Sequence, residues 1–103
     1  MTSEPAGTFV IGRMGRIEDV DDRACALLGY SLSELRALHG SQLIPPQDRA
    51  AVAVSMDRMR RGEIKRRRGR LLRKDGTAIA VEVTAHRDGG EQLTLIVHLV
   101  AAA

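Results

Sequence analysis

Three short signatures, spread in fixed order over about half the chain, constrain its fold more than any other feature. Each marks a different structural junction: the capped start of a short helix, the start of a longer helix, and a tight hairpin turn. Their order predicts helices first and paired strands afterwards. The signatures are Leu28-Gly29-Tyr30-Ser31 with Glu34-Leu35, then Pro46-Gln47-Asp48-Arg49, then Arg73-Lys74-Asp75-Gly76-Thr77.

The first signature carries the clearest local signal. Ser31 and Glu34 form a Ser-x-x-Glu capping box, in which the serine accepts from the third helical N–H and the glutamate reaches back to the cap. Tyr30 and Leu35 occupy the positions of the hydrophobic staple around that box. A short helix is therefore expected to start at Ser31.

Residues upstream of this box predict a hairpin and one more helix. Residues 8–12 and 16–20 gather β-formers between glycines, which predicts two short strands joined by a turn. Asp21 or Asp22 can then cap a short helix, and Gly29 is placed to end it in a left-handed conformation.

A longer helix is predicted from Pro46 to about Arg61, after a loop that begins at His39. Proline and aspartate in its first turn suit a helix start, and Gly62 ends it. Its apolar residues recur at helical spacing and are expected to form the buried stripe: Val52, Met56 and Met59.

From Glu63 onward the apolar period changes to two, which predicts three antiparallel strands. Asp75-Gly76 and Gly89-Gly90 predict tight primed turns between them. The whole order is typical of an α+β domain. The residues expected to face the core are Ile79, Val81, Val83 and Ala85, followed by Leu93, Leu95, Val97 and Leu99.

The size of the chain, 103 residues, predicts one domain over residues 1–103, with a core from about 7 to 100. No apolar run is long enough to cross a bilayer, and residues 1–5 lack the basic start and apolar stretch of a signal peptide. We therefore expect a cytoplasmic protein that does not contact membranes. Cys25 is the single cysteine and three histidines lie far apart in the sequence, so no disulfide and no metal site is expected.

The three signatures, at these positions, resemble those of the PAS family, and the resemblance covers about Gly7 to Val100. It implies a five-stranded antiparallel β-sheet, with short helices and one longer helix packed on one face. It also implies a sensory or signal-transduction module, with any small ligand held between sheet and helices. The chain would either act alone, signalling by association, or form part of a longer two-component regulator such as a sensor kinase or cyclic-dinucleotide enzyme.

This chain lacks the residues that bind haem or flavin in PAS relatives. Haem-binding members place an axial histidine on the long helix, where this chain has only small apolar residues from Ala50 to Val54. Flavin-adduct members use a cysteine in an Asn-Cys-Arg-Phe setting, whereas Cys25 lies before Gly29 and lacks those neighbours. No cofactor-binding residue is therefore expected, and haem and flavin are disfavoured.

The space between the long helix and the sheet has two interpretations. It is either filled by the protein's own side chains or occupied by a small apolar or carboxylate ligand. Both draw on the same residues, because an apolar stripe at this spacing is usually core. Enzyme motifs are absent from the sequence, so no catalytic residue is expected. The ligand-lining candidates are Val52, Met56, Met59, Ile79, Val81, Leu95 and Val97.

Positive charge is concentrated between residues 58 and 74, where ten basic residues accompany a single acidic one, Glu63. The basic patch of Lys65, Arg66, Arg67, Arg68 and Arg70 falls on a predicted strand. It could contact nucleic acid, an acidic protein or anionic lipid, or the acidic stretch Glu18 to Asp22 of a second copy. A solvated strand whose charge prevents edge-to-edge aggregation is the favoured explanation, since the absence of aromatic residues speaks against single-stranded nucleic acid.

Apolar residues on the outer face of the last strand favour self-association. Ile96 and Val100 would project there, with Ala78 and Ala80 beside them, and an exposed apolar patch favours a partner. We therefore expect a homodimer with Ile96 and Val100 at its centre. The leading functional hypothesis is a sensor that works through protein–protein association, with a signalling effector domain as a further partner. The alternative is a small nucleic-acid-binding regulator that uses residues 58–74.

Overall fold

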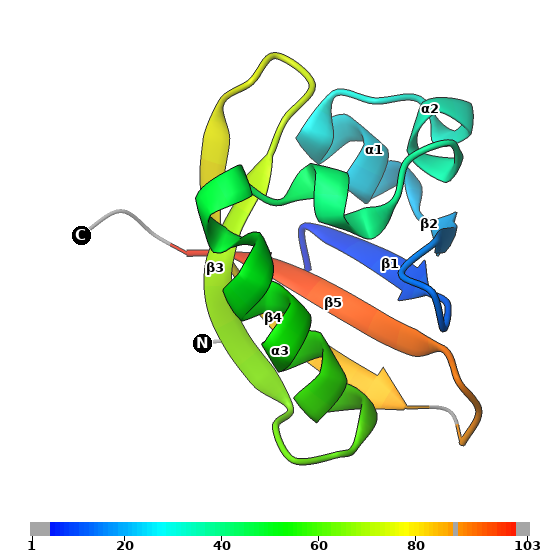
Figure 1. Cartoon of the computed structure of the whole chain (residues 1–103). Helices are drawn as coiled ribbons and strands as arrows, with labels where there is room; N and C mark the ends of the chain where they lie inside the picture. Colours follow the sequence, from blue (N-terminus) through cyan, green and yellow to red (C-terminus); the bar gives the residue numbers. More distant parts are fainter. Residues whose placement is uncertain (1–4, 88, 101–103) are drawn as a thin grey trace.

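The computed structural model describes residues 5–87 and 89–100, so residues 1–4, 88 and 101–103 of the predicted domain lie outside the description. Its strands form one antiparallel sheet in the order β2-β1-β5-β4-β3, with the helices on one face (Figure 1). The predicted α+β architecture is therefore confirmed. The strands are β1 (Gly7–Ile11), β2 (Ile17–Val20), β3 (Arg66–Leu72), β4 (Ala78–Arg87) and β5 (Leu93–Leu99).

The last strand of the chain returns to the middle of the sheet beside the first. β5 pairs with β1 from Gly7 opposite Val97 to Ile11 opposite Leu93, and its other edge pairs with β4. The helical segment between β2 and β3 therefore crosses the sheet (Figure 1). Its elements are α1 (Asp22–Leu28), α2 (Leu32–Arg36), the 3₁₀ turns η1 (Gly40–Leu43) and η2 (Pro46–Asp48), and α3 (Arg49–Arg60).

Side-chain caps position α1 and α2. The carboxylate of Asp21 accepts from the backbone N–H of Ala24 at 2.9 Å and from that of Thr8 at 3.1 Å, so the α1 cap is also tied to β1. The predicted capping box of α2 is present, since Ser31 Oγ accepts from Glu34 N and Glu34 Oε1 accepts from Ser31 N.

The predicted loop between His39 and Pro46 is wrong in part, because it contains η1. His39 Nδ1 accepts from the backbone N–H of Ser41, and the Gln42 side chain accepts from His39 N. Histidine is not among the usual N-cap residues, so this turn was not predicted. The longer helix also starts later than Pro46, with α3 beginning at Arg49 after η2.

The turn between β3 and β4 differs from the predicted primed turn. Gly76 has φ of +89°, but no non-glycine residue among those described has positive φ, so Asp75 remains in the ordinary region. The carboxylate of Asp75 instead accepts from the N–H and hydroxyl of Thr77. The second hairpin differs likewise, because Gly89 has positive φ and Gly90 does not.

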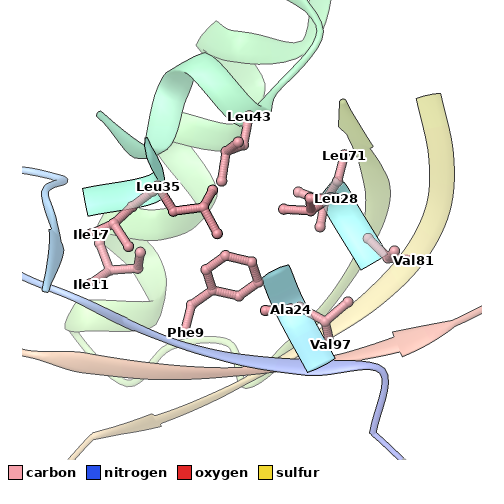
Figure 2. Close-up of a cluster of buried hydrophobic side chains, with 10 residues drawn as sticks. All are labelled: Phe9, Ile11, Ile17, Ala24, Leu28, Leu35, Leu43, Leu71, Val81 and Val97. Atoms are coloured by element: carbon pink, nitrogen blue, oxygen red, sulfur yellow. The ribbon is translucent and has the colours of Figure 1, made fainter. Parts of the chain in front are cut away.

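The core is centred on Phe9, whose ring lies between Leu35 on one side and Leu28 on the other (Figure 2). Val81 and Val97 form part of the same core on the side of the sheet. One core-facing prediction is wrong: Leu99, the last residue of β5, is 51% exposed. A second, smaller cluster is separate from this core and consists of Met59, Ala85 and Leu93.

The fit between α1 and β1 depends on a glycine. A Cβ atom on Gly7 would lie 2.8 Å from both Cα and Cβ of Ala24, which is fully buried. Only a glycine facing an alanine allows the helix and the strand to approach this closely. This contact fixes α1 against β1.

Candidate functional site

A cavity of about 370 Å³ lies between α3 and the sheet. Its walls come from β1, β5, η1 and α3, with single residues from β3 and β4. Its volume falls within the range that small-molecule sites occupy, and its lining is mainly apolar. The apolar residues that border it include Phe9, Ile11, Leu43, Ile44, Val52, Met56, Leu71, Val83, Leu95 and Val97.

Four of the seven predicted lining residues border this cavity: Val52, Met56, Leu95 and Val97. The other three lie elsewhere. Met59 belongs to the second cluster with Ala85 and Leu93, Val81 is buried in the main core, and Ile79 packs against that core.

Arg60 is a partly buried polar residue in the cavity wall that sequence reasoning did not single out. It lies in the last turn of α3, and its Nη2 donates to the carbonyl of Gly12 at 2.9 Å. Its Nε is buried and has no hydrogen-bond partner among the described residues. The backbone carbonyl of Arg60 also accepts from Nη1 of Arg87 at 3.0 Å. The guanidinium is therefore held by Gly12 while its buried Nε has no partner among the described residues.

A signal for Arg60 was present in the sequence. Val52, Met56 and Arg60 follow one another at intervals of four, so they occupy one row on the face of α3. The apolar pattern favoured Met59 as the next member of the stripe. The cavity is instead lined by the row that ends in Arg60.

His39 closes the cavity at the β1–β2 turn. Its Nε2 lies 2.6 Å from the carbonyl of Met14, and the backbone N–H of Gly40 donates to Gly15. Gly15 has φ of +79°, and a Cβ there would lie 2.5 Å from the His39 ring. The turn and η1 thus pack tightly, with exposed Arg13 and Arg49 in the same wall.

The basic segment is partly neutralised by carboxylates outside residues 58–74. Arg70 pairs with Asp48 at 3.0 Å and Lys74 with Glu34 at 2.6 Å. Asp57 and Glu82 bind further arginines of the segment, so four carboxylates from outside residues 58–74 reduce its local excess from nine charges to five. Such surface pairs contribute little stability individually, but they weaken the field that a nucleic acid would experience.

Residues of the basic patch divide between the two faces of β3. Arg66, Arg68 and Arg70 lie opposite Thr84, Glu82 and Ala80 on the outer face. Arg67 lies on the inner face, and its Nη1 is buried without a partner among the described residues.

The predicted dimer residues also lie on the outer face of the sheet. Ile96, which is half-buried, is flanked in register by Thr8 on β1 and Thr84 on β4. Val100 donates its N–H to the carbonyl of Ala80, and Ala80 and Ala78 are both exposed. The outer face therefore has the half-buried Ile96 between two threonines at its centre and a small apolar margin of Val100, Ala78 and Ala80 at one end.

Local environment shifts the pKa values of three titratable groups, and hydrogen bonds from Thr77 lower that of Asp75. Hydrogen bonds from Lys74 and from the backbone of Ser31 lower the pKa of Glu34 to about 2. Burial, and then the charges of Asp22 and Asp21, raise the pKa of the Cys25 thiol, which is the chemistry of a packed rather than a reactive cysteine. No group of side chains suited to hold a metal ion occurs within residues 5–87 and 89–100.

A family profile described as the PAS fold matches residues 17–93. The chain therefore belongs to the PAS fold family, and it is a sensory or signalling domain of that family. No curated protein sequence matches it significantly. None of the helices in the described part of the chain is long and apolar enough to span a membrane.

Solved structures of PAS domains resemble this one closely. A domain of the sensory box sensor histidine kinase/response regulator from Geobacter sulfurreducens is 27% identical with a TM-score of 0.80, covering 89% of this chain and 81% of that one. A PAS domain from Desulfitobacterium hafniense is 19% identical with a TM-score of 0.83, covering 95% of each chain. The PAS domain of the Cronobacter turicensis RpfR quorum-sensing receptor, in complex with C12:0, is 12% identical with a TM-score of 0.80, covering 98% and 100%. The last two share the fold alone.

Proposed function

We propose that this domain senses a small apolar carboxylate held in the cavity between α3 and the sheet. The observation that carries the proposal is the guanidinium of Arg60, which borders this apolar cavity with a buried and unpartnered Nε. A buried charge without a partner is costly, and an anionic ligand would remove that cost.

The geometry around Arg60 favours a carboxylate over a neutral group. Nη2 donates to Gly12, and Nε, which has no partner among the described residues, shares one edge of the planar group with Nη2. Two parallel N–H groups on that edge match the two oxygens of a carboxylate. The apolar wall beyond, from Val52 and Met56 to Leu95 and Val97, would bury an aliphatic tail.

The structural relatives support both ligand binding and signalling by this domain. The PAS domain of the Cronobacter receptor is in complex with C12:0, an apolar carboxylate, in a protein of the same fold. The Geobacter relative is a domain of a sensor histidine kinase/response regulator. We therefore infer that this domain passes its signal to an effector domain or protein by association.

Homodimerisation through the outer face of the sheet is the form of association that we propose. Ile96 would lie at its centre, with Val100, Ala78 and Ala80 along one margin. This face lies on the opposite side of β5 from the cavity residues Leu95 and Val97. A ligand that shifts β5 would therefore act on the interface directly.

The ligand proposal is tested by comparing dodecanoate with dodecanol, which share a tail and differ in the headgroup. We expect dodecanoate to raise the melting temperature and bind more tightly in calorimetric titration. Arg60→Met should remove the preference for dodecanoate, while Arg58→Met, an exposed position on the same helix, should retain it. Circular dichroism confirms that each variant folds.

Two outcomes contradict the proposal. Equal affinity for the acid and the alcohol in the unchanged protein would show that Arg60 does not recognise the headgroup. Absence of binding to either, with native mass spectrometry showing no added mass on protein purified from cells, would show that the cavity is not a ligand site.

A further inference from the structure

One edge of the sheet is open and the other is covered. At the β2 edge, Arg16 forms an isolated bridge with His39, and Asp19 receives Arg36 of α2 at 3.5 Å. At the opposite edge, β3 pairs with β4 alone, and no described residue outside β4 pairs with the backbone of Arg66–Leu72. An unpaired edge of seven residues is a template for another strand.

The open edge carries positive charge that the chain itself does not balance. Arg66 and Arg68 are 72% and 74% exposed and share a single carboxylate, Glu82, at 3.9 and 3.4 Å. Lys65 has no acceptor among the described residues, and Nη1 of Arg67 is buried without one. The strand therefore has more cationic donors than acceptors on both faces.

Gly69 leaves an opening on the inner face of the same edge. A Cβ atom at this position would have no heavy atom within 4 Å, although its neighbour two residues on, Leu71, is buried. A glycine inside a strand often marks a place where another backbone or ligand approaches closely. The opening could accept an apolar side chain from a strand lying alongside.

We propose that the free edge of β3 is a docking site for an extended acidic segment of a partner protein, which adds to the sheet as a further strand. Its backbone would pair with Arg66–Leu72, as in other cases of strand addition. Carboxylates two residues apart would lie beside Arg66 and Arg68 on the outer face. The next residue of the segment, beyond the carboxylate beside Arg68, would point to the inner face and fill the space at Gly69.

A second copy of this chain is a poor occupant of the edge. If two β3 strands paired with each other, arginines would lie beside arginines, and like charges opposite each other destabilise a strand pair. The β2 edge of another copy is covered, as described above. The proposal concerns a surface separate from the cavity, and it does not depend on the ligand.

The test uses a fluorescein-labelled peptide of alternating glutamate and valine, seven residues long, titrated by anisotropy at low salt. We expect binding that Arg66→Glu/Arg68→Glu weakens about tenfold or more, since several cross-strand pairs turn repulsive. The matched control is Arg16→Glu/Arg36→Glu at the covered edge, which changes the net charge equally and should change affinity about twofold or less.

Backbone pairing is tested with the same peptide carrying methyl groups on alternate backbone nitrogens. We expect this peptide to bind about tenfold more weakly, because each methyl group removes a donor. Equal binding of the methylated peptide would overturn strand addition and leave only charge attraction. Failure of the unmodified peptide to bind, or its displacement by a 16-base-pair DNA duplex that binds more tightly, would also overturn the proposal.

Discussion

Lys74 Nζ lies 2.6 Å from Oε2 of Glu34, an ion pair that joins residues 40 positions apart in the sequence. The other oxygen of Glu34 accepts from the backbone N–H of Ser31 at the start of α2. One carboxylate therefore completes a helix cap and holds the β3–β4 hairpin against that helix. Two signatures that are separate in the sequence form one structural unit.

Glu34 makes stability depend on pH at the acid end. Its pKa is about 2 in the folded protein against an ordinary value of 4.5, so its ionised form stabilises the fold above about pH 4.5 and this contribution is lost as the pH falls toward 2. Glu34→Gln should lower the urea midpoint at pH 6, and the difference from the parent should shrink steadily between pH 4.5 and 2. A difference that stays constant over this range would contradict the assignment.

Two glycines are expected to respond oppositely to the same substitution. Gly7→Ala should destabilise the protein by about 1–3 kcal/mol, because its methyl group would lie 2.8 Å from the backbone of Ala24. Gly69→Ala meets open space and should be neutral or stabilising by about 0.4–1 kcal/mol. Urea unfolding of the two variants measures both. Similar losses in the two would show that the close approach of α1 to β1 is not what Gly7 provides.

Filling the cavity should raise the stability of the fold and lower its affinity for the ligand. Val83→Ile adds one methylene at a half-buried position in the wall, and its burial should stabilise the fold by up to about 0.8 kcal/mol. We expect a higher melting temperature together with weaker binding of dodecanoate. If stability falls instead, the space beside Val83 is smaller than the structure indicates.

The proposed dimer is tested at its centre. Ile96→Glu should give the mass of a monomer by light scattering, because it places a charge in the apolar centre of the interface. Val54→Glu on α3, where the side chain is 62% exposed on the other side of the sheet, should leave the dimer intact. A monomeric parent protein at high concentration, or a dimeric Ile96→Glu variant, would disprove the proposed interface.

Local chemistry made much of the fold predictable. The Ser31 box, the Asp21 cap and the helix end at Gly29 depend on residues within one turn, and all three are present. The His39 cap was missed because it depends on an uncommon capping residue. Likewise, the predicted primed turn at Asp75-Gly76 failed because Asp75 found a hydrogen-bond partner in Thr77.

The candidate site was less predictable because it depends on how α3 lies over the sheet. Met59 and Arg60 are adjacent in the sequence, and either could continue the stripe from Met56. Packing sends Met59 into a separate cluster and leaves Arg60 at the cavity. A search for apolar periodicity cannot select Arg60 over Met59, because it counts only apolar residues as candidates for the interior.

The division of the core into two clusters has a mechanical consequence for α3. The helix is held by Met59 at its C-terminal end and by Arg49, which donates to the carbonyls of Ser41 and Ile44, at its N-terminal end. Between these ends Val52 and Met56 border the cavity. What occupies the space beneath α3 would therefore set how far the middle of the helix lies from the sheet.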